Sequence, residues 1–423
     1  MSAYLLECID CGRRYLPDEA KYLCPLCGES FQASQPLPGL LRCIYDYENL
    51  SRQFGPDVLA ERAERGLGRW AELLPLASLE SLPPLIESAT PLRPALRLGQ
   101  ILGIDDLWLK DDTGLPTASL KDRASAMVVA CARERGCEVV ATASTGNAAT
   151  ALAGMAASVD LESVVFVPAS APPAKLAQIA IYGSRLIPID GKYDQAFSLS
   201  IEACEEFGWY CRNTAYNPFT VEGKKTAALE IWEQLNYSVP DWIVVPTGDG
   251  VILAGIEKAF SDLAALNLIK KIPRLALIQA AGCQPLVRAI NEGRDEVVPE
   301  VNPRSLADSI AVGVPRAGRW ALKAIRDSKG TAIAVSDAEI LEAMALLGRT
   351  TGIFAEPAAS ASIAGVEKLS ASGMIRPDER VVALITGNGL KDVSAAMEAV
   401  SLPKPVKSTI DAVRQFIKQG GKS

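Results

Sequence analysis

Residues 138–154 read EVVATASTGNAATALAG and contain the pattern that decides the fold. An apolar run up to Ser144 predicts a buried strand, and the alanine-rich segment after it predicts a helix that begins near Asn147. Between them lie Thr145 and Gly146. Hydroxyls and free backbone N–H groups at a helix N-terminus favour an anion such as a carboxylate. The alternative is that Ser144 and Thr145 only cap the helix, because capping residues are common at helix starts.

The same alternation of strand and helix patterns continues along the chain. Further strand candidates lie at 163–168, 184–189, 242–248, 274–280 and 380–387. Continuous apolar strands that alternate with helices predict an α/β fold with doubly wound parallel sheets covered on both faces. A chain of 423 residues exceeds one ordinary hydrophobic core, so we expect more than one domain. Ligands of such sheets bind beyond the carboxyl ends of the strands.

Composition excludes several classes of function. The chain is 49% hydrophobic and carries a net charge of −7, which disfavours nucleic acid as the main partner. It has no apolar run of about 20 residues, and its start, MSAYLLECIDCG, lacks the features of a signal peptide, so we expect no membrane association and a cytoplasmic location. Histidine is absent, which excludes Ser-His-Asp and Cys-His hydrolases.

Two more predicted strands end in residues that suit a ligand. In IVVPTGDGVILAG (243–255), Gly248 and Gly250 let backbone N–H groups approach a phosphate, provided that the Asp249 carboxylate points away from the anion. The glycine spacing differs from the dinucleotide-binding fingerprint, which disfavours a nicotinamide dehydrogenase. In ALITGNGLKD, Thr386 places a hydroxyl at a strand end, although an ordinary turn has the same pattern.

The segment TGLPTASLKDRA (113–124) places Lys121 at a predicted helix start, which Thr117 or Ser119 could cap. A cation is disfavoured there by the helix dipole. Most lysines are solvated at the surface, but an uncharged amine at this position could do chemistry. An amine, a carboxylate cradle, a phosphate cup and a hydroxyl are the set that a lysine Schiff base to pyridoxal phosphate needs, and that chemistry needs no histidine.

Four of the ten cysteines lie in the first 27 residues, as Cys8-x2-Cys11 and Cys24-x2-Cys27. Two such pairs are typical of a closed, structural Zn²⁺ site with four thiolates. Disulfides and free thiols are the alternatives, and disulfides are disfavoured in a protein without a secretion signal.

Four motifs in order resemble those of the fold type II pyridoxal-phosphate enzymes, and within that group those of the threonine synthases. They are PTASLKDR (116–123), STGN (144–147), PTGDG (246–250) and TGNGLKD (386–392), and the resemblance spans roughly residues 85–395. It implies a fold like that of the tryptophan synthase β subunit, with the site between two doubly wound α/β domains. Some members of the family carry paired CxxC motifs before this region.

The resemblance also implies domain limits. A zinc-ribbon-like module would occupy residues 1–35 and an irregular or helical connector residues 36–90. The large cofactor-binding domain would comprise residues 91–116 and 230–423, and the small domain, with the Ser-Thr-Gly-Asn loop, residues 117–229.

Roles for individual residues follow from the same resemblance. Lys121 would take the Schiff-base position, Asn147 would contact the 3′-oxygen of the cofactor, and Thr386 would face its pyridine nitrogen. The cofactor phosphate would lie on Gly248, Asp249, Gly250 and Val251. The substrate would contact Ser144, Thr145, Gly146 and Lys224.

The motif NPFTVEGKKT (217–226) departs from the family pattern. The family has an arginine, associated with the substrate phosphate, where Thr220 stands, and a glutamine at Lys224. We expect Lys224, Lys225 or another residue to replace that arginine if the substrate carries a phosphate. Milder departures are Ala118 for a glycine, Leu120 for a phenylalanine and Asn388 for a histidine.

The expected function is therefore that of a pyridoxal-phosphate-dependent carbon–oxygen lyase. A threonine synthase-like enzyme converts O-phospho-L-homoserine and water to L-threonine and phosphate, and the family implies a homodimer. Alternatives are β-replacement or elimination on phosphoserine, as in cysteate synthases, and serine/threonine dehydration. A zinc-ribbon binding protein on a degenerate enzyme scaffold is an alternative from another class.

Overall fold

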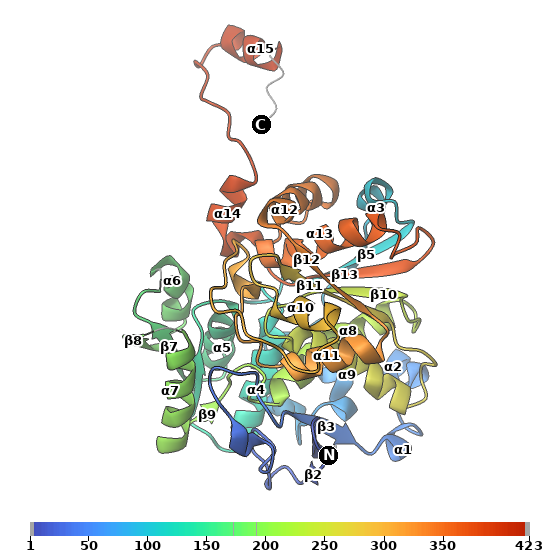
Figure 1. Cartoon of the computed structure of the whole chain (residues 1–423), viewed down its shortest axis with the longest axis vertical. Helices are drawn as coiled ribbons and strands as arrows, with labels where there is room; N and C mark the ends of the chain where they lie inside the picture. Colours follow the sequence, from blue (N-terminus) through green and yellow to red (C-terminus); the bar gives the residue numbers. More distant parts are fainter. Residues whose placement is uncertain (1–3, 172, 192, 419–423) are drawn as a thin grey trace.

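The computed structural model describes residues 4–171, 173–191 and 193–418 (Figure 1). Two largely parallel sheets with helices against them form the body, and a small antiparallel sheet lies at the N-terminal end of the chain. This arrangement confirms the α/β fold with more than one doubly wound unit.

The larger sheet has six strands in the order β12-β11-β10-β13-β5-β4. Their bounds are Thr331–Val335 (β12), Arg274–Ala280 (β11), Trp242–Pro246 (β10), Arg380–Ile385 (β13), Asp106–Asp111 (β5) and Leu92–Pro94 (β4). The pairs from β12 to β5 are parallel, and β4 runs antiparallel to β5. The strands expected at 242–248, 274–280 and 380–387 are confirmed, whereas β5, β12 and the short β4 were not predicted.

Alternate residues of these strands enter two different hydrophobic clusters, which shows that the sheet is buried on both faces. On β10, Ile243 and Val245 belong to one cluster, and Trp242 and Val244 belong to the other. The first face packs on α9 (Val251–Ala265), α10 (Pro285–Asn291) and α11 (Gly318–Asp327). The second face packs on α3 (Leu96–Leu102) and α13 (Pro357–Ala371), and α12 (Asp337–Thr351) packs against these two helices. Burial on two faces explains the uninterrupted apolar runs in the sequence.

The smaller sheet is fully parallel, in the order β8-β7-β6-β9. Its strands are Arg185–Ile189 (β8), Glu162–Pro168 (β7), Val139–Ala143 (β6) and the two-residue Tyr210–Cys211 (β9). Its helices are α4 (Lys121–Glu134), α5 (Asn147–Ala157), α6 (Pro173–Ile181) and α7 (Tyr193–Glu206). Three of these strands match the predictions, and β9 had no pattern long enough to recognise.

The N-terminal sheet has the order β2-β1-β3, formed by Tyr4–Cys8 (β1), Arg14–Tyr15 (β2) and Leu41–Tyr45 (β3). Because β3 pairs with β1 along five residues, this sheet continues past the limit expected at residue 35. After it come short helical segments at Tyr47–Leu50 (α1), Pro56–Glu61 (α2), Gly66–Leu73 (η2) and Leu79–Ser81 (η3), and Gly28–Ser30 (η1) lies within the cysteine region.

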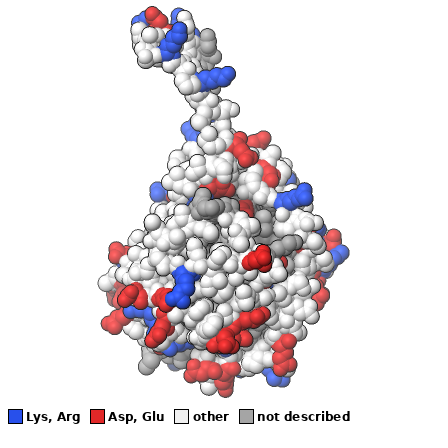
Figure 2. All heavy atoms as spheres, turned by 90° about the vertical axis from the view of Figure 1, so that its left-hand side faces the viewer, with Lys and Arg blue, Asp and Glu red and all other residues white. Residues whose placement is uncertain are grey.

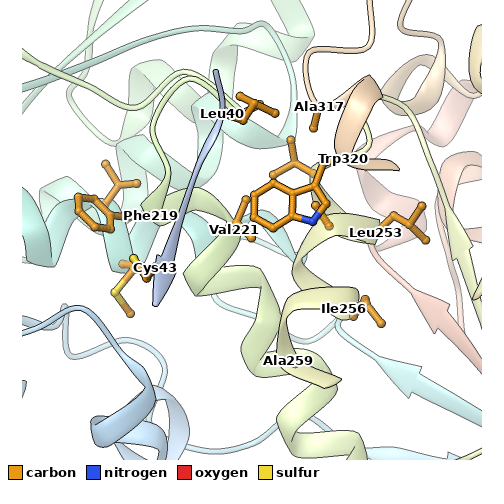
Figure 3. Close-up of a cluster of buried hydrophobic side chains, with 14 of the residues drawn as sticks. Leu40, Cys43, Phe219, Val221, Leu253, Ile256, Ala259, Ala317 and Trp320 are labelled. Atoms are coloured by element: carbon orange, nitrogen blue, oxygen red, sulfur yellow. The ribbon is translucent and has the colours of Figure 1, made fainter. Parts of the chain in front are cut away.

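Helix α8 (Phe219–Gln234) and helix α9 lie at the centre of the molecule, where the N-terminal sheet packs against them. Figure 3 shows Leu40 and Cys43 near Phe219 and Val221 of α8. Trp320 lies beside Val221, on the side away from Phe219.

A cluster of buried charges also joins the two helices. Lys225 is paired with Glu222 and with Asp262 (Nζ–Oδ2 2.9 Å), and Lys258 is paired with Asp262. Tyr45 of β3 donates a hydrogen bond to Glu222 (2.7 Å).

The chain ends in an arm that leaves the body. After η5 (Gly389–Lys391) and α14 (Val393–Glu398), an extended segment leads to α15 (Ile410–Lys418). Figure 2 shows α15 standing clear of the body. The final helix expected from the sequence is present, and the tail expected after it lies outside the described residues. Over the described ranges, no helix combines the length and the apolar character needed to cross a membrane.

Candidate active site

A cavity of about 570 Å³ lies at the carboxyl ends of strands from both parallel sheets. Its wall includes every residue predicted to contact cofactor or substrate: Lys121, Ser144, Thr145, Gly146, Asn147, Lys224, Gly248, Asp249, Gly250, Val251 and Thr386. Motifs that are up to 265 residues apart in the sequence therefore meet in one place. A loop at 300–314 forms part of the same wall, and its sequence gave no indication of this.

Lys121 is the first residue of α4 and opens on this cavity. Its amine makes no ion pair or hydrogen bond with any described residue. Burial lowers the pKa of Lys121, and the cation Arg212 lowers it further, whereas the carboxylate of Glu356 opposes the shift. Burial and Arg212 therefore make the charged amine less favourable here than at an exposed lysine, which eases the conflict with the helix dipole.

The loop before Lys121 is joined to the loop after β13. The N–H of Leu120 donates to Thr386 O (2.9 Å), and the N–H of Asn388 donates to Ala118 O (3.0 Å). These bonds hold Thr386 beside the start of α4. The Thr386 hydroxyl lines the cavity and makes no hydrogen bond within the described part of the chain, so it is free to serve a ligand.

The expected caps of α4 are absent from the described contacts. Ser119 Oγ is buried without a hydrogen-bond partner, and the Thr117 hydroxyl instead donates to the Asp122 carboxylate. The backbone N–H of Thr117 donates to the same carboxylate (2.7 Å). Asp122, in the first turn, thus ties the preceding loop to the helix, and burial raises its pKa to about 6.

Ala118, where the family has a glycine, has a φ of +68°. This is the left-handed region that favours glycine, so the change is less mild than the sequence suggested.

Helix α5 starts at Asn147 after Gly146, and the described residues provide no side-chain cap. The Ser144 hydroxyl accepts a hydrogen bond from Gly146 N (3.2 Å) and does not cap the helix. The capping alternative is therefore wrong for Ser144, and the residues at the start of α5, Gly146, Asn147 and Ala148, line the cavity.

Asn147 has a partner that the sequence did not reveal. Its amide donates to both carboxylate oxygens of Glu356 (3.1 and 2.9 Å). Glu356 is 3% exposed and precedes α13, and burial raises its pKa. The contact fixes the rotamer of Asn147 and thereby the direction in which its amide points.

Helix α9 starts after Gly250, which has a φ of +88°. The carboxylate of Asp249 accepts a hydrogen bond from the backbone N–H of Arg316 (3.1 Å). One oxygen of this carboxylate is thus held by the neighbouring loop, while Asp249 also lines the cavity. A phosphate at Gly248–Val251 stays a prediction. The N-terminus of a 15-residue helix then supplies free N–H groups to the cavity.

The two lysines considered as replacements for the family arginine lie in different surroundings. Lys224 lines the cavity, whereas Lys225 is completely buried in the charge cluster with Glu222 and Asp262. Thr220 is also buried, and its hydroxyl donates to Asn217 O (2.8 Å). Neither Thr220 nor Lys225 is part of the cavity wall.

The Sγ atoms of Cys8, Cys11, Cys24 and Cys27 all lie within 4.8 Å of one another. The other six cysteines are free thiols that take no part in this cluster. The two predicted pairs therefore form one site that could hold a metal ion.

The cavity fits pyridoxal phosphate on its own geometry. An unpaired buried amine, a free hydroxyl and a helix N-terminus with crowded glycines are present in one wall. These are the groups needed for the aldehyde carbon, the ring nitrogen and the phosphate of the cofactor.

Comparison with known proteins defines the class. The profile of the pyridoxal-phosphate dependent enzyme family matches residues 84–387, and the chain belongs to this family. Among its relatives is the threonine synthase of Methanocaldococcus jannaschii, 38% identical over 416 residues, which cover 98% of this chain and 100% of the relative. The threonine synthase of Bacillus sp. (strain ULM1) is 36% identical over 83% of this chain and 97% of its own. The chain is accordingly a member of the threonine synthase family.

Solved structures agree on the fold. A threonine deaminase from Solanum lycopersicum superposes with a TM-score of 0.63 over 74% of this chain and 88% of its own, at 22% identity. Diaminopropionate ammonia lyase from Escherichia coli reaches 0.64 over 95% of this chain and 97% of its own, at 16% identity. Both support the fold type II architecture.

Proposed function

We propose that the enzyme converts O-phospho-L-homoserine and water to L-threonine and phosphate. The support is the set of predicted residues that meet in one cavity, together with threonine synthases as full-length relatives. Pyridoxal phosphate, when bound, withdraws electrons from the α-carbon of the amino acid.

In this proposal Lys121 both holds the cofactor and moves protons. Its amine, whose pKa burial lowers, removes the proton from the substrate α-carbon and then transfers a proton at the β-carbon. With no histidine in the chain, no imidazole is available for this work. The N–H groups and hydroxyls of Ser144, Thr145 and Gly146 hold the substrate carboxylate.

Asn147 and Thr386 tune the site. The amide of Asn147, directed by Glu356, would donate to the 3′-oxygen of the cofactor. The Thr386 hydroxyl would offer the ring nitrogen a neutral hydrogen bond and no charge.

The test is Lys121→Ala. We expect loss of the visible absorption band of the lysine-bound cofactor and a fall in kcat of at least about 10³-fold, because nucleophile and base are removed together. Lys323→Ala, at an exposed position on α11, is the control and should keep both properties. An active Lys121→Ala variant with the band intact would end the proposal.

A phosphoserine substrate is the second candidate, because Thr220 stands where the family has an arginine. Product analysis separates the cases: threonine and phosphate from O-phosphohomoserine, a sulfonate from phosphoserine and sulfite, or an oxo acid from serine or threonine.

We also propose that the four-cysteine cluster holds a structural Zn²⁺. A tetrahedron with Zn–S bonds of about 2.3 Å has S–S edges of about 3.8 Å. The Cys11 and Cys24 Sγ atoms are 3.9 Å apart. Four thiolates leave no open position for catalysis. Elemental analysis should give one zinc per chain and none in a Cys24→Ser variant.

Finally, we propose a cytoplasmic homodimer. Reduced thiols in the metal cluster require a reducing compartment. On α15, Ile410, Val413 and Ile417 are exposed apolar side chains, which supports a second copy as their partner. Light scattering on the full chain and on a chain shortened after residue 400 tests this, and a monomeric full chain would refute it.

A further inference from the structure

Arg212 is a buried arginine without a carboxylate partner. Arg212 follows β9, lines the cavity and is only 1% exposed. Within the described residues, its guanidinium makes one hydrogen bond, from Nε to Ser125 Oγ (3.2 Å), and Nη2 has no partner. Buried charges are normally paired, because leaving one unpaired costs several kcal/mol. An unpaired arginine at a cavity wall indicates an anionic ligand.

Lys224 repeats this pattern on the neighbouring helix. It is 3% exposed, lines the same cavity and has no ion pair or hydrogen bond among the described residues. Lys225, next in sequence, shows the contrast, since two carboxylates neutralise it. Burial lowers the pKa of Arg212 to about 10, and burial together with the cations Arg212 and Lys121 lowers that of Lys224. Among the described residues, neither Arg212 nor Lys224 forms an ion pair with a carboxylate of the cavity wall.

Arg212 and the glycine loop proposed for the cofactor phosphate follow strands of different sheets. The glycine loop before α9 follows β10 of the larger sheet, whereas Arg212 follows β9 of the smaller one. The N–H of Arg212 donates to Ala141 O (2.7 Å), so Arg212 lies beside β6, which leads into the loop Ser144–Asn147. Adjacent strands are about 4.8 Å apart. A short amino acid held by its carboxylate at that loop could reach Arg212 with a second anion.

We propose that Arg212 and Lys224 bind the phosphate of the substrate and replace the arginine that the family has at Thr220. The inference rests on the proposed function and specifies its substrate site. Thr220 cannot serve, because it is buried behind the wall with its hydroxyl bonded to Asn217 O. The planar fork of an arginine suits two phosphate oxygens, and the lysine adds a point charge.

The experiment compares Arg212→Met with Arg212→Lys in the holoenzyme. We expect the KM for O-phosphohomoserine to rise about 10- to 100-fold in Arg212→Met, the equivalent of losing a hydrogen bond to a charged group. Inhibition by inorganic phosphate should weaken to the same degree. The KM of Arg212→Lys should lie between those of the wild type and Arg212→Met, because the lysine keeps the charge and lacks the planar guanidinium. The cofactor absorption band and the affinity for the cofactor should stay unchanged.

Two further variants sharpen the result. Lys224→Gln introduces the residue of the family, and we expect a smaller rise in KM. Arg185→Met is the matched control: Arg185 lies on β8 of the same sheet, exposed and paired with Glu162, so the same loss of charge should leave the KM unchanged.

Several outcomes would overturn the inference. An unchanged KM and unchanged phosphate inhibition in both Arg212 variants would remove the arginine from the substrate site. A loss of cofactor affinity with an unchanged KM would assign it to the cofactor phosphate. If the wild-type enzyme makes no threonine, the proposed function fails by itself. Titration of wild-type and Arg212→Lys holoenzyme with inorganic phosphate then still decides whether Arg212 binds an anion.

Discussion

Two helix N-termini open on the cavity, and their surroundings differ. A Cβ added to Gly146, before α5, would meet no described atom within 4 Å. A Cβ added to Gly248 or Gly250, before α9, would lie 2.9 Å from Val312 and 3.0 Å from Ala317 O, respectively. The backbone before α9 is thus tightly packed by neighbouring residues, whereas the backbone before α5 has space for a side chain. The difference suggests a fixed anchor for the cofactor and an adaptable loop for the substrate.

Support for α9 comes from distant parts of the chain. The backbone N–H of Arg316 donates to Asp249, and its side chain donates to Ala33 O and to Gln35 O (3.2 Å). The N–H of Leu37 returns a bond to Arg316 O (3.1 Å). The segment after the cysteine cluster is therefore bonded to the residue that holds the loop before α9. No comparable bond from the N-terminal module to the loop before α5 is found among the described residues.

The strongest test exchanges glycine for alanine at both helix starts. In Gly250→Ala, the left-handed backbone costs about 1–2 kcal/mol and the close contact adds a similar amount, so we expect roughly 100-fold weaker cofactor binding. Gly146→Ala should keep the cofactor and change only the KM. Spectroscopic titration of both apoenzymes with pyridoxal phosphate measures this. Gly136→Ala, with a φ of +64° and open space around it, controls for the backbone cost alone. Equal losses at 146 and 250 would break the comparison.

Helix α4 provides a third N-terminus, which Asp122 in its first turn connects to the preceding loop. The pH dependence of stability tests this connection. The folded-state pKa of Asp122 is about 6, above the unfolded value of 3.8, so the native state binds the proton more tightly. Below pH 4, Asp122 therefore contributes about 3 kcal/mol to the free energy of unfolding. This contribution is lost as the pH rises through 6.

Urea unfolding at pH 4.5 and 7 measures this contribution. The difference between wild type and Asp122→Asn should shrink or reverse at pH 7, because the variant has no carboxyl to titrate. A wild-type advantage that grows with pH would show instead that Asp122 is stabilised as an anion.

Removal of the proposed Zn²⁺ tests the support of α9 by the N-terminal module. After chelation the bonds of Ala33, Gln35 and Leu37 to Arg316 should weaken, and we expect cofactor affinity to fall about tenfold, as for one charged hydrogen bond. Substrate KM, measured at saturating cofactor, should change little. Re-addition of Zn²⁺ is the control. Cofactor affinity that ignores chelation would separate the module from α9.

The smallest effect is expected at Ala118. Ala118→Gly relieves a left-handed alanine and should raise the free energy of unfolding by about 0.5–1 kcal/mol. Ala126→Gly, in the middle of α4, should lower it by about 1 kcal/mol. Thermal melting of the two variants gives the comparison, and a destabilised Ala118→Gly would show that the loop is not strained.

The sequence predicted what periodicity and glycine spacing encode. Long apolar strands such as 274–280 were recognised because burial on both faces leaves no polar interruption. The two-residue strand β9 offers no such pattern, so Arg212 at its end was missed. Glu356 was missed for a related reason: its role depends on Asn147, 209 residues away, and no local pattern carries that contact. Ser119 failed as a cap because the first N–H groups of the helix, those of Asp122 and Arg123, donate to the backbone oxygens of Ser119 and Leu120 instead.

The buried cluster of Glu222, Lys225, Lys258 and Asp262 limits how this protein can change during evolution. Each lysine there shares its carboxylates with the other, and Tyr45 closes the group from the N-terminal sheet. Replacing any single charged member would leave a buried charge without a partner, at a cost of about 3–5 kcal/mol. Divergence at these positions should therefore proceed by paired replacements, and related chains should carry either the whole ionic set or an apolar one.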